Sequence, residues 1–203
     1  MKLFFDTEFT GLHKGTSLIS IGIVSESGKK FYAELTDFDD TQCDSWIEKN
    51  VLEHLMLNGE MKEESFDDLN TTYIFGDKAT VRDELLLWLD ELTADFTDSG
   101  EYFQFVSDVC HYDMVLLLDL LNEQSAMQIP ELVNPCCHDI SQDIAMILDI
   151  SEKTAFDYSR EQLLTDRGID LPNGKKHNAL YDAEVIKAIY DDFFETVKEG
   201  GNG

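Results

Sequence analysis

The chain begins with a short apolar segment that leads directly into two carboxylates one residue apart. The segment is Leu3-Phe4-Phe5, and the acids are Asp6 and Glu8. In a β-strand, residues i and i+2 project from the same face, so the pattern predicts a strand that carries both acids on one side. Two like charges held so close repel each other, and a divalent cation would neutralise both. The spacing therefore indicates a metal site, although an ordinary Asp-x-Glu at a solvated strand end has the same sequence.

Two more strands are expected close behind the first. Residues 18–24 read Leu-Ile-Ser-Ile-Gly-Ile-Val and residues 30–34 alternate, so with residues 2–6 they predict a three-stranded meander with the acids on its first strand. Further along, the pattern predicts a short helix over 46–57, an extended segment over 70–76, a helix over 80–92 capped by Thr80, a strand over 103–106 and a helix over 114–121. This order predicts an α/β domain with a mixed sheet.

The last helix has the clearest periodicity, and Asn178 stands where its N-cap should be. Its apolar residues recur at steps of three and four: Ala179, Ala183, Ile186, Tyr190, Phe193 and Val197. Asp182 flanks this stripe, so we expect its carboxylate to face inward, where it needs a cation, a donor or the helix N-terminus. A first-turn aspartate stabilised by the helix dipole alone is the alternative interpretation.

His177 lies in the loop just before this helix, five residues from Asp182. A loop histidine beside metal-bound carboxylates can take a proton from water near neutral pH. A single histidine is more often structural, but this one accompanies the acids, so we interpret it as a candidate general base.

Length and composition predict one domain over residues 1–203, with residues Glu199 to Gly203 as a disordered tail. Apolar runs are far shorter than the roughly 20 residues that span a bilayer, and the N-terminal one is too short for a secretory signal. We therefore expect no membrane association and a cytoplasmic protein. The four cysteines lack zinc-ligand spacing, so reduced, buried thiols are expected.

The net charge restricts the partners. The chain has 15 Lys plus Arg against 42 Asp plus Glu, for a formal charge of -27. Nucleic acids are normally bound by basic surfaces. Either the partner is not a nucleic acid, or few phosphates are held and metal ions supply the positive charge.

Three motifs, taken in order, resemble those of the DEDDh branch of 3′-to-5′ exonucleases. The first is Asp6-Thr7-Glu8-Phe9-Thr10-Gly11-Leu12, the second Tyr112-Asp113, and the third runs from His177-Asn178-Ala179-Leu180 to Asp182-Ala183. The strand at 18–24 is similar to the second strand of a compact exoribonuclease branch of bacteria and phages.

The resemblance implies an RNase H-like fold, a mixed sheet flanked by helices. It implies that four acids hold two Mg²⁺ or Mn²⁺ ions, with His177 as the base that helps generate hydroxide. The four acids are Asp6, Glu8, Asp113 and Asp182. Asp108 is a rival for Asp113, because this chain has Ser107-Asp108 where the family often has His-Asn.

The resemblance also implies a pocket for the terminal nucleotide. Its lining would be Thr7, Phe9, Thr10 and Leu12. Core packing is the alternative for Phe9 and Leu12, and Tyr112 would either stack on a base or lie in the core.

The function that the sequence favours is hydrolysis of single-stranded RNA, or RNA 3′ ends, to nucleoside monophosphates by a two-metal mechanism. The acidic composition favours short oligonucleotides. A DNA 3′-to-5′ exonuclease of the proofreading or repair type has the same motifs and remains an alternative. A non-catalytic acidic protein that imitates nucleic acid is a third interpretation. Homodimers are common in the family, so a homodimer stays open.

Overall fold

One mixed sheet forms the centre of the molecule. The computed structural model describes residues 1–57, 70–95, 102–122 and 133–200, without the side chains of 195–200. Its sheet has the strand order β4-β3-β2-β1-β5-β6. The strands are β1 (Lys2–Phe9), β2 (Leu18–Ser25), β3 (Lys30–Leu35), β4 (Thr71–Gly76), β5 (Gln104–Ser107) and β6 (His138–Asp139). The first three pair antiparallel and the other pairs are parallel. The predicted α/β class, with a meander and a mixed sheet, is confirmed.

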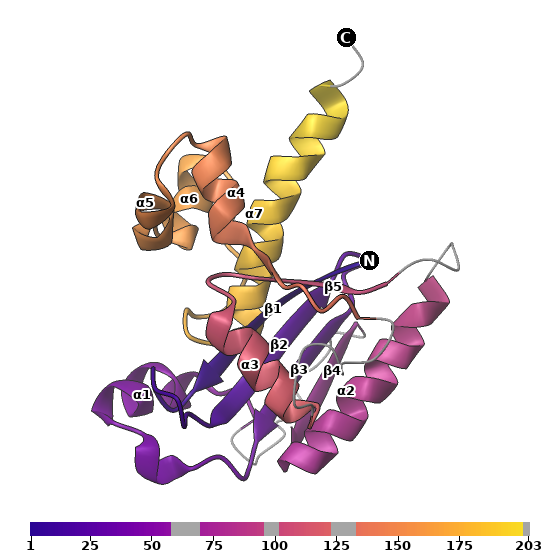
Figure 1. Cartoon of the computed structure of the whole chain (residues 1–203), viewed down its shortest axis with the longest axis vertical. Coiled ribbons are helices and arrows are strands. Elements are labelled where there is room, and N and C mark those ends of the chain that lie inside the picture. Colours follow the sequence, from indigo (N-terminus) through magenta and orange to yellow (C-terminus); the bar gives the residue numbers. More distant parts are fainter. Residues whose placement is uncertain (58–69, 96–101, 123–132, 201–203) are drawn as a thin grey trace.

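Long helices cover both faces of this sheet. Helices α2 (Lys78–Leu92) and α3 (His111–Leu120) lie on one face, and α7 (Ala179–Gly200) crosses the other (Figure 1). Leu3 and Phe5 of β1 pack in the core under α2 and α3, whereas Phe4 packs with residues of α7. Because side chains alternate along a strand, Asp6 and Glu8 point to the same side as Phe4. Both acids therefore face α7.

The short helices lie around the long ones. Helix α1 (Ser45–Asn50) follows β3, while α4 (Ile140–Ile147), α5 (Glu152–Asp157) and α6 (Arg160–Asp166) gather beside the middle of α7 (Figure 1). Side-chain caps begin α4, α5 and α6, because Asp139, Ser151 and Ser159 each accept a hydrogen bond from a backbone N–H of the first turn. The described residues also include three single 3₁₀ turns: Asp40–Gln42, Leu52–His54 and Thr93–Asp95.

A glycine lets α7 approach the sheet beside the acids. Gly22 of β2 pairs with Asp6 of β1. A Cβ at Gly22 would lie 2.3 Å from the backbone N of Leu180 and 2.4 Å from the carbonyl of Ala179. The predicted cap of α7 is confirmed, since Asn178 Oδ1 accepts a hydrogen bond from Tyr181 N at 3.2 Å. The start of α7 thus lies directly against β2, next to the strand that carries the acids.

Several local predictions are wrong. Helix α2 is capped by Asp77, whose carboxylate accepts from Thr80 N at 2.8 Å, so Thr80 lies inside the helix. The helix expected over 46–57 begins after the capping Asp44 and has only six residues, ending at Asn50. A 3₁₀ turn at Leu52–His54 follows it. The cysteines are free, as expected, but Cys136 is exposed and the other three are half-buried.

The C-terminal prediction needs a smaller correction. Helix α7 continues to Gly200, so Glu199 and Gly200 lie in its last turn, and residues 201–203 lie outside the described residues. A single domain over the whole chain stays a prediction. Within the described ranges, no helix has the length and apolar character to cross a bilayer.

Candidate functional site

Three of the four predicted acids, Asp6, Glu8 and Asp182, line one cavity together with the predicted histidine, His177. Its volume is about 730 Å³, and β1, α1, the α5–α6 connection and the start of α7 contribute to its lining. Ligand atoms of Glu8, His177 and Asp182 all lie within 4.8 Å of one another, so this group could hold a metal ion. Asp6 also lines the cavity. Residues from the two ends of the chain therefore converge at one point.

Asp6 and Glu8 are in an environment that disfavours their charged forms. Burial raises the pKa of Asp6 well above its usual value, and the charges of Asp113, Asp182 and Glu8 raise it further. Burial likewise raises the pKa of Glu8, and the charges of Asp182 and Asp113 raise it further. Desolvated acids that repel one another are stabilised in their charged forms by a cation. The electrostatics thus fit a divalent metal ion.

Asp182 connects the helix to the histidine loop. Its Oδ2 accepts a hydrogen bond from the backbone N of His177 at 2.8 Å. Burial raises the pKa of Asp182 to about 7, although this hydrogen bond opposes the increase. The dipole-only interpretation therefore does not describe this carboxylate, since the histidine backbone and the neighbouring acids also act on it.

His177 is held in an uncommon backbone conformation. Its φ is 62°, in the left-handed region that residues other than glycine and asparagine rarely adopt. The indole of Trp46, from α1, stands edge-on to its ring at 5.1 Å between centroids. Burial lowers the pKa of His177, and the nearby charges of Lys176 and His54 lower it further. A neutral imidazole, able to accept a proton, is therefore favoured at pH 7.

Asp113 is buried and is not among the residues that line the cavity. The pairing of β1 with β5 ends at Phe4, which leaves the backbone N–H of Thr7 free to donate to Asp113 Oδ1 at 3.0 Å. The Thr7 hydroxyl donates to the same oxygen at 2.6 Å, and Ser107 Oγ donates to Oδ2 at 2.8 Å. Burial raises the pKa of Asp113 to about 6 despite these donors. Asp113 is not among the described lining residues, but its charge acts on Asp6 more strongly than that of any other neighbouring acid.

Asp108, the rival of Asp113, does line the cavity. Its carboxylate is bound on both oxygens by the guanidinium of Arg160, at 2.6 and 2.8 Å. An acid already paired in this way is a weaker candidate for a metal ligand than an unpaired one. The role of Asp113 as a ligand stays a prediction.

The four predicted nucleotide-binding residues, Thr7, Phe9, Thr10 and Leu12, all line the cavity. Leu12 is 79% exposed, so core packing is wrong for it. Phe9 stacks on Tyr112 with 5.3 Å between centroids and 18° between planes, which occupies one face of each ring. The Thr10 hydroxyl donates to Gln42 Oε1 at 2.6 Å and fixes the loop that presents Leu12.

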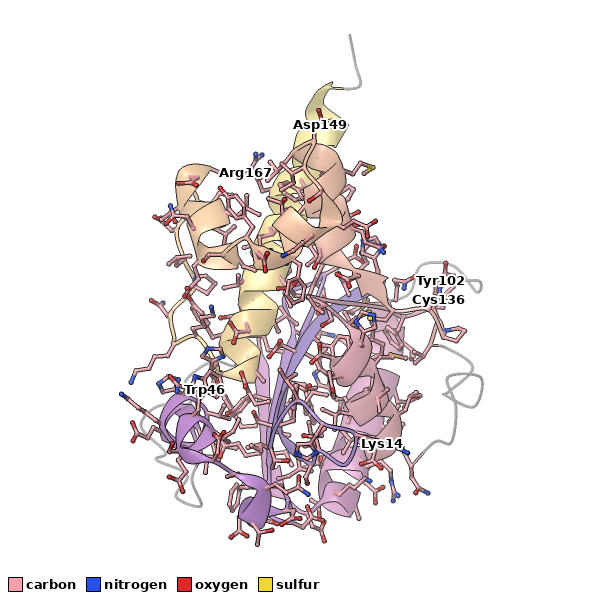
Figure 2. The ribbon with its side chains drawn as sticks, turned by 60° about the vertical axis from the view of Figure 1, so that its left-hand side comes forward. Lys14, Trp46, Tyr102, Cys136, Asp149 and Arg167 are labelled. Carbon is pink, nitrogen blue, oxygen red and sulfur yellow. The ribbon has the colours of Figure 1, made fainter. Side chains whose placement is uncertain are left out.

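Sequence reasoning did not identify three other lining residues. Trp46 and Lys176 flank His177, and Arg160 holds Asp108. Figure 2 shows Trp46 beside the N-terminal end of α7. Lys176 directly precedes His177, and this adjacency is the sequence signal that could have identified it as a lining residue. Trp46 and Arg160 reach the site only through the tertiary fold.

A family model matches nearly the whole chain. The model described as the 3′-5′ exoribonuclease Rv2179c-like domain matches residues 1–193. A protein of Mycobacterium tuberculosis strain H37Rv, named 3′-5′ exoribonuclease Rv2179c, is 33% identical over 128 residues. Its counterpart in strain CDC 1551 matches equally. The matched part is 63% of this chain and spans 65% of the length of each relative.

Solved structures show the same fold. A 3′-exonuclease described as recognising the 3′ end of the histone mRNA stem-loop superposes with a TM-score of 0.62 at 13% identity, covering 96% of this chain and 63% of the other. Cell-death related nuclease 4 superposes with a TM-score of 0.57 at 15% identity, covering 96% of this chain and 64% of the other. The RNase H-like fold implied by the three motifs is confirmed.

Proposed function

The chain belongs to the family of the 3′-5′ exoribonuclease Rv2179c-like domain, and from this premise we propose that it hydrolyses single-stranded RNA from the 3′ end to nucleoside monophosphates. One observation carries the proposal: Glu8, His177 and Asp182 place their ligand atoms within 4.8 Å of one another at the wall of a cavity that Asp6 also lines. Convergence of carboxylates from opposite ends of the chain on one point is expected for phosphodiester hydrolysis with divalent cations.

The acids fit Mg²⁺ or Mn²⁺ because carboxylate oxygens are the ligands that these ions prefer. We propose two ions, held by Asp6, Glu8, Asp113 and Asp182. When bound, such ions lower the pKa of a water molecule and offset charge on the departing oxygen. The raised pKa values of Asp6 and Glu8 support this assignment, because buried acids that repel one another are costly to ionise unless a cation binds between them.

His177 is proposed as the general base. Its lowered pKa favours the neutral ring that can take a proton from water. The bond from its backbone N to Asp182 fixes the loop that carries it. His177 also lies close enough to Glu8 and Asp182 to act as a metal ligand, and the two roles make different predictions for metal affinity.

The substrate's terminal nucleotide is proposed to occupy the cavity along residues 7–12. Among the described residues, three exposed apolar side chains line this cavity: Leu12, Trp46 and Phe156, with 79%, 50% and 58% exposure. Apolar and aromatic side chains pack on any base, which suits a single strand of any sequence. Cleavage would therefore show little base preference.

Digestion of a 5′-labelled RNA oligomer tests the proposal. We expect a ladder that shortens from the 3′ end with Mg²⁺ or Mn²⁺, no cleavage in chelator, and weaker cleavage of DNA of the same sequence. Asp6→Asn should be inactive, whereas Asp90→Asn, a change of an exposed acid on α2, should match the wild type. Internal cleavage, a preference for DNA, or intact RNA under all conditions would contradict the proposal. Two ions rather than one, a homodimer and a cytoplasmic location stay predictions that this assay does not test.

A further inference from the structure

An ion pair in the cavity wall is not used by the proposed mechanism. Asp108, just after β5, and Arg160, at the start of α6, both line the cavity. Arg160 Nε donates to Asp108 Oδ2 at 2.8 Å, and Nη2 donates to Asp108 Oδ1 at 2.6 Å. The Arg160 side chain is only 10% exposed and the Asp108 side chain 25%. This bidentate, largely buried pair is the strong form of a carboxylate–guanidinium contact.

The guanidinium has no donor left for a ligand within the described part of the chain. Nη1 donates to the carbonyls of Ala155 and Tyr158 at 2.6 and 2.7 Å, and Nη2 also donates to Ser141 Oγ at 3.0 Å. With the two bonds to Asp108, these account for all five N–H groups of an arginine. A cation in the wall of a candidate nuclease site suggests a phosphate anchor, but this one is already saturated.

The position of Asp108 makes its charge important. Its carboxylate lies close enough to raise the pKa of Asp6, Asp113 and Asp182. An unpaired Asp108 would therefore add one negative charge and two further oxygen ligands beside the four acids. The bond from Ser141 Oγ at 2.8 Å fixes the carboxylate in its paired orientation.

We propose that Arg160 is a positioning residue that withholds Asp108 from the metal-binding acids, so that Asp108 does not add a fifth carboxylate to Asp6, Glu8, Asp113 and Asp182. This inference rests on the proposed function, because it concerns the metal site of that reaction. The paired side chains together add no net charge to the cavity wall. Arg160 also joins the α4 start and the α5–α6 connection to the segment that leads into α3, so it fixes that wall while it neutralises it.

Binding of Mn²⁺, measured by calorimetry on four proteins of residues 1–203 (the wild type, two single variants and the double variant), tests the inference. Asp108→Asn leaves the Arg160 charge unpaired and should weaken affinity by about 3- to 10-fold. Arg160→Met frees the Asp108 charge and should strengthen affinity by a similar factor. The double variant restores neutrality and should bind within about twofold of the wild type. If the ion pair only maintained the fold, the two single variants would not change the affinity for Mn²⁺ in opposite directions.

The double variant also gives the decisive contrary result. If it binds Mn²⁺ as weakly as Asp108→Asn, then Asp108 is itself a ligand and the inference is overturned. Equal affinity of all four proteins would overturn it too, because the pair would then not act on the site. If none of the four proteins binds Mn²⁺, the proposed metal site fails and the inference fails with it.

Two controls separate charge from folding. Arg160→Lys keeps the positive charge without the bidentate geometry and should bind Mn²⁺ like the wild type, and weaker or stronger binding by it would overturn the inference. If Arg160→Met does not fold, the neutral and polar Arg160→Gln replaces it in the series with the same expected increase in affinity. Asp192→Asn removes the ion-pair partner of Arg167, and Arg167 lies far from Trp46 (Figure 2). This variant should leave the affinity for Mn²⁺ unchanged. Circular dichroism confirms the fold of each protein.

Discussion

At the scale of single residues, the site places acids that disfavour their charged forms beside a histidine that favours its neutral form. Burial raises the pKa of Asp6, Glu8 and Asp182 and lowers that of His177. Both shifts favour the uncharged species, so the metal-free site has less charge than the residue types suggest. Divalent cations would reverse this for the acids while leaving the imidazole neutral.

Replacing His177 should remove the base without removing the acids. For His177→Gln at saturating Mn²⁺, we expect kcat/KM to fall by about 10²- to 10⁴-fold, the usual contribution of a general base. The wild-type rate should rise with pH and level off above a pKa that lies below the usual histidine value, because the ring must be neutral to accept the proton. A pH profile from 4.5 to 8.5 should show this increase in the wild type and not in the variant.

The affinity for Mn²⁺ distinguishes a base from a ligand at the same position. If His177 acts only as a base, His177→Gln should bind Mn²⁺ within a few-fold of the wild type. A large loss of affinity would instead assign His177 to the metal, which the 4.8 Å group with Glu8 and Asp182 also allows.

Replacing Asp182 should stabilise the metal-free protein. Its folded pKa of about 7 lies above the usual value, so its deprotonation costs folding free energy at pH 8, and this cost disappears as pH falls through 7 towards the unfolded pKa near 4. Asp182→Asn keeps an acceptor for His177 N and should raise the free energy of unfolding by about 1 to 3 kcal/mol at pH 8 in chelator. Urea denaturation at pH 8 and pH 5 measures the change.

The pH dependence provides the check on this explanation. The stabilisation should shrink at pH 5, where the wild-type carboxyl is protonated in the folded state, and should reverse in saturating Mn²⁺, because the variant lacks a proposed ligand. Equal stabilisation at both pH values would show that the charge of Asp182 is not the cause.

At the scale of elements, the site depends on how closely α7 approaches β2. A Cβ at position 22 would lie 2.3 to 2.4 Å from backbone atoms of Leu180 and Ala179, and backbone cannot rotate away as a side chain can. Gly22→Ala should therefore push the start of α7 from the sheet and displace His177 and Asp182 together. We expect a loss of about 1 to 3 kcal/mol in stability and a loss of most activity.

Gly15 offers a matched control for this change. No atom lies within 4 Å of a Cβ built there, so Gly15→Ala should fold and cleave RNA like the wild type. Thermal unfolding and the RNA ladder assay should be run on both variants. Activity retained by Gly22→Ala would mean that α7 can shift without opening the site.

Elements with a strong local pattern could be predicted, and the short ones could not. The meander, α2, α3 and α7 have runs of apolar residues long enough to show a period, so their locations agree with the prediction to within a few residues. Helices α4, α5 and α6 have only eight, six and seven residues, too few for a clear period, and no prediction was made for them. Caps were harder: Asp77 and Thr80 both have suitable side chains, and only the fold selects Asp77.

The candidate site divides in the same way. Asp6, Glu8, His177 and Asp182 belong to motifs that span a few residues, so the sequence alone could predict them as site residues, and the structure places all four at the cavity. Arg160 meets Asp108 across 52 positions, and Trp46 meets His177 from another helix; neither contact has a local signal. The choice between Asp108 and Asp113 as a metal ligand likewise depends on tertiary contacts, because these contacts determine which of the two carboxylates is neutralised. No rule of sequence spacing predicts such contacts.

At the scale of the whole molecule, the net charge of -27 opposes the approach of any polyanion. Repulsion between the protein and RNA extends over about one Debye length, roughly 30 Å in 0.01 M salt and about 8 Å in 0.15 M salt. A small nucleotide contact near the cations of the site meets little of this field, whereas a long strand extends across the acidic surface. Salt should therefore act on this protein in the direction opposite to that for a basic nucleic-acid binder.

We expect kcat/KM on a 20-nucleotide RNA to rise about 3- to 10-fold between 0.01 and 0.15 M KCl at a fixed, saturating Mn²⁺ concentration, because screening removes long-range repulsion before it weakens contacts in the cavity. The increase should be smaller for a trinucleotide, which carries few phosphates beyond the site. Steady-state rates on both substrates across the salt series measure the difference. A rate that falls with salt, as for proteins that grip the backbone with lysine and arginine, would mean that a local basic surface governs encounter despite the overall charge, and the preference for short RNA would then lose its electrostatic basis.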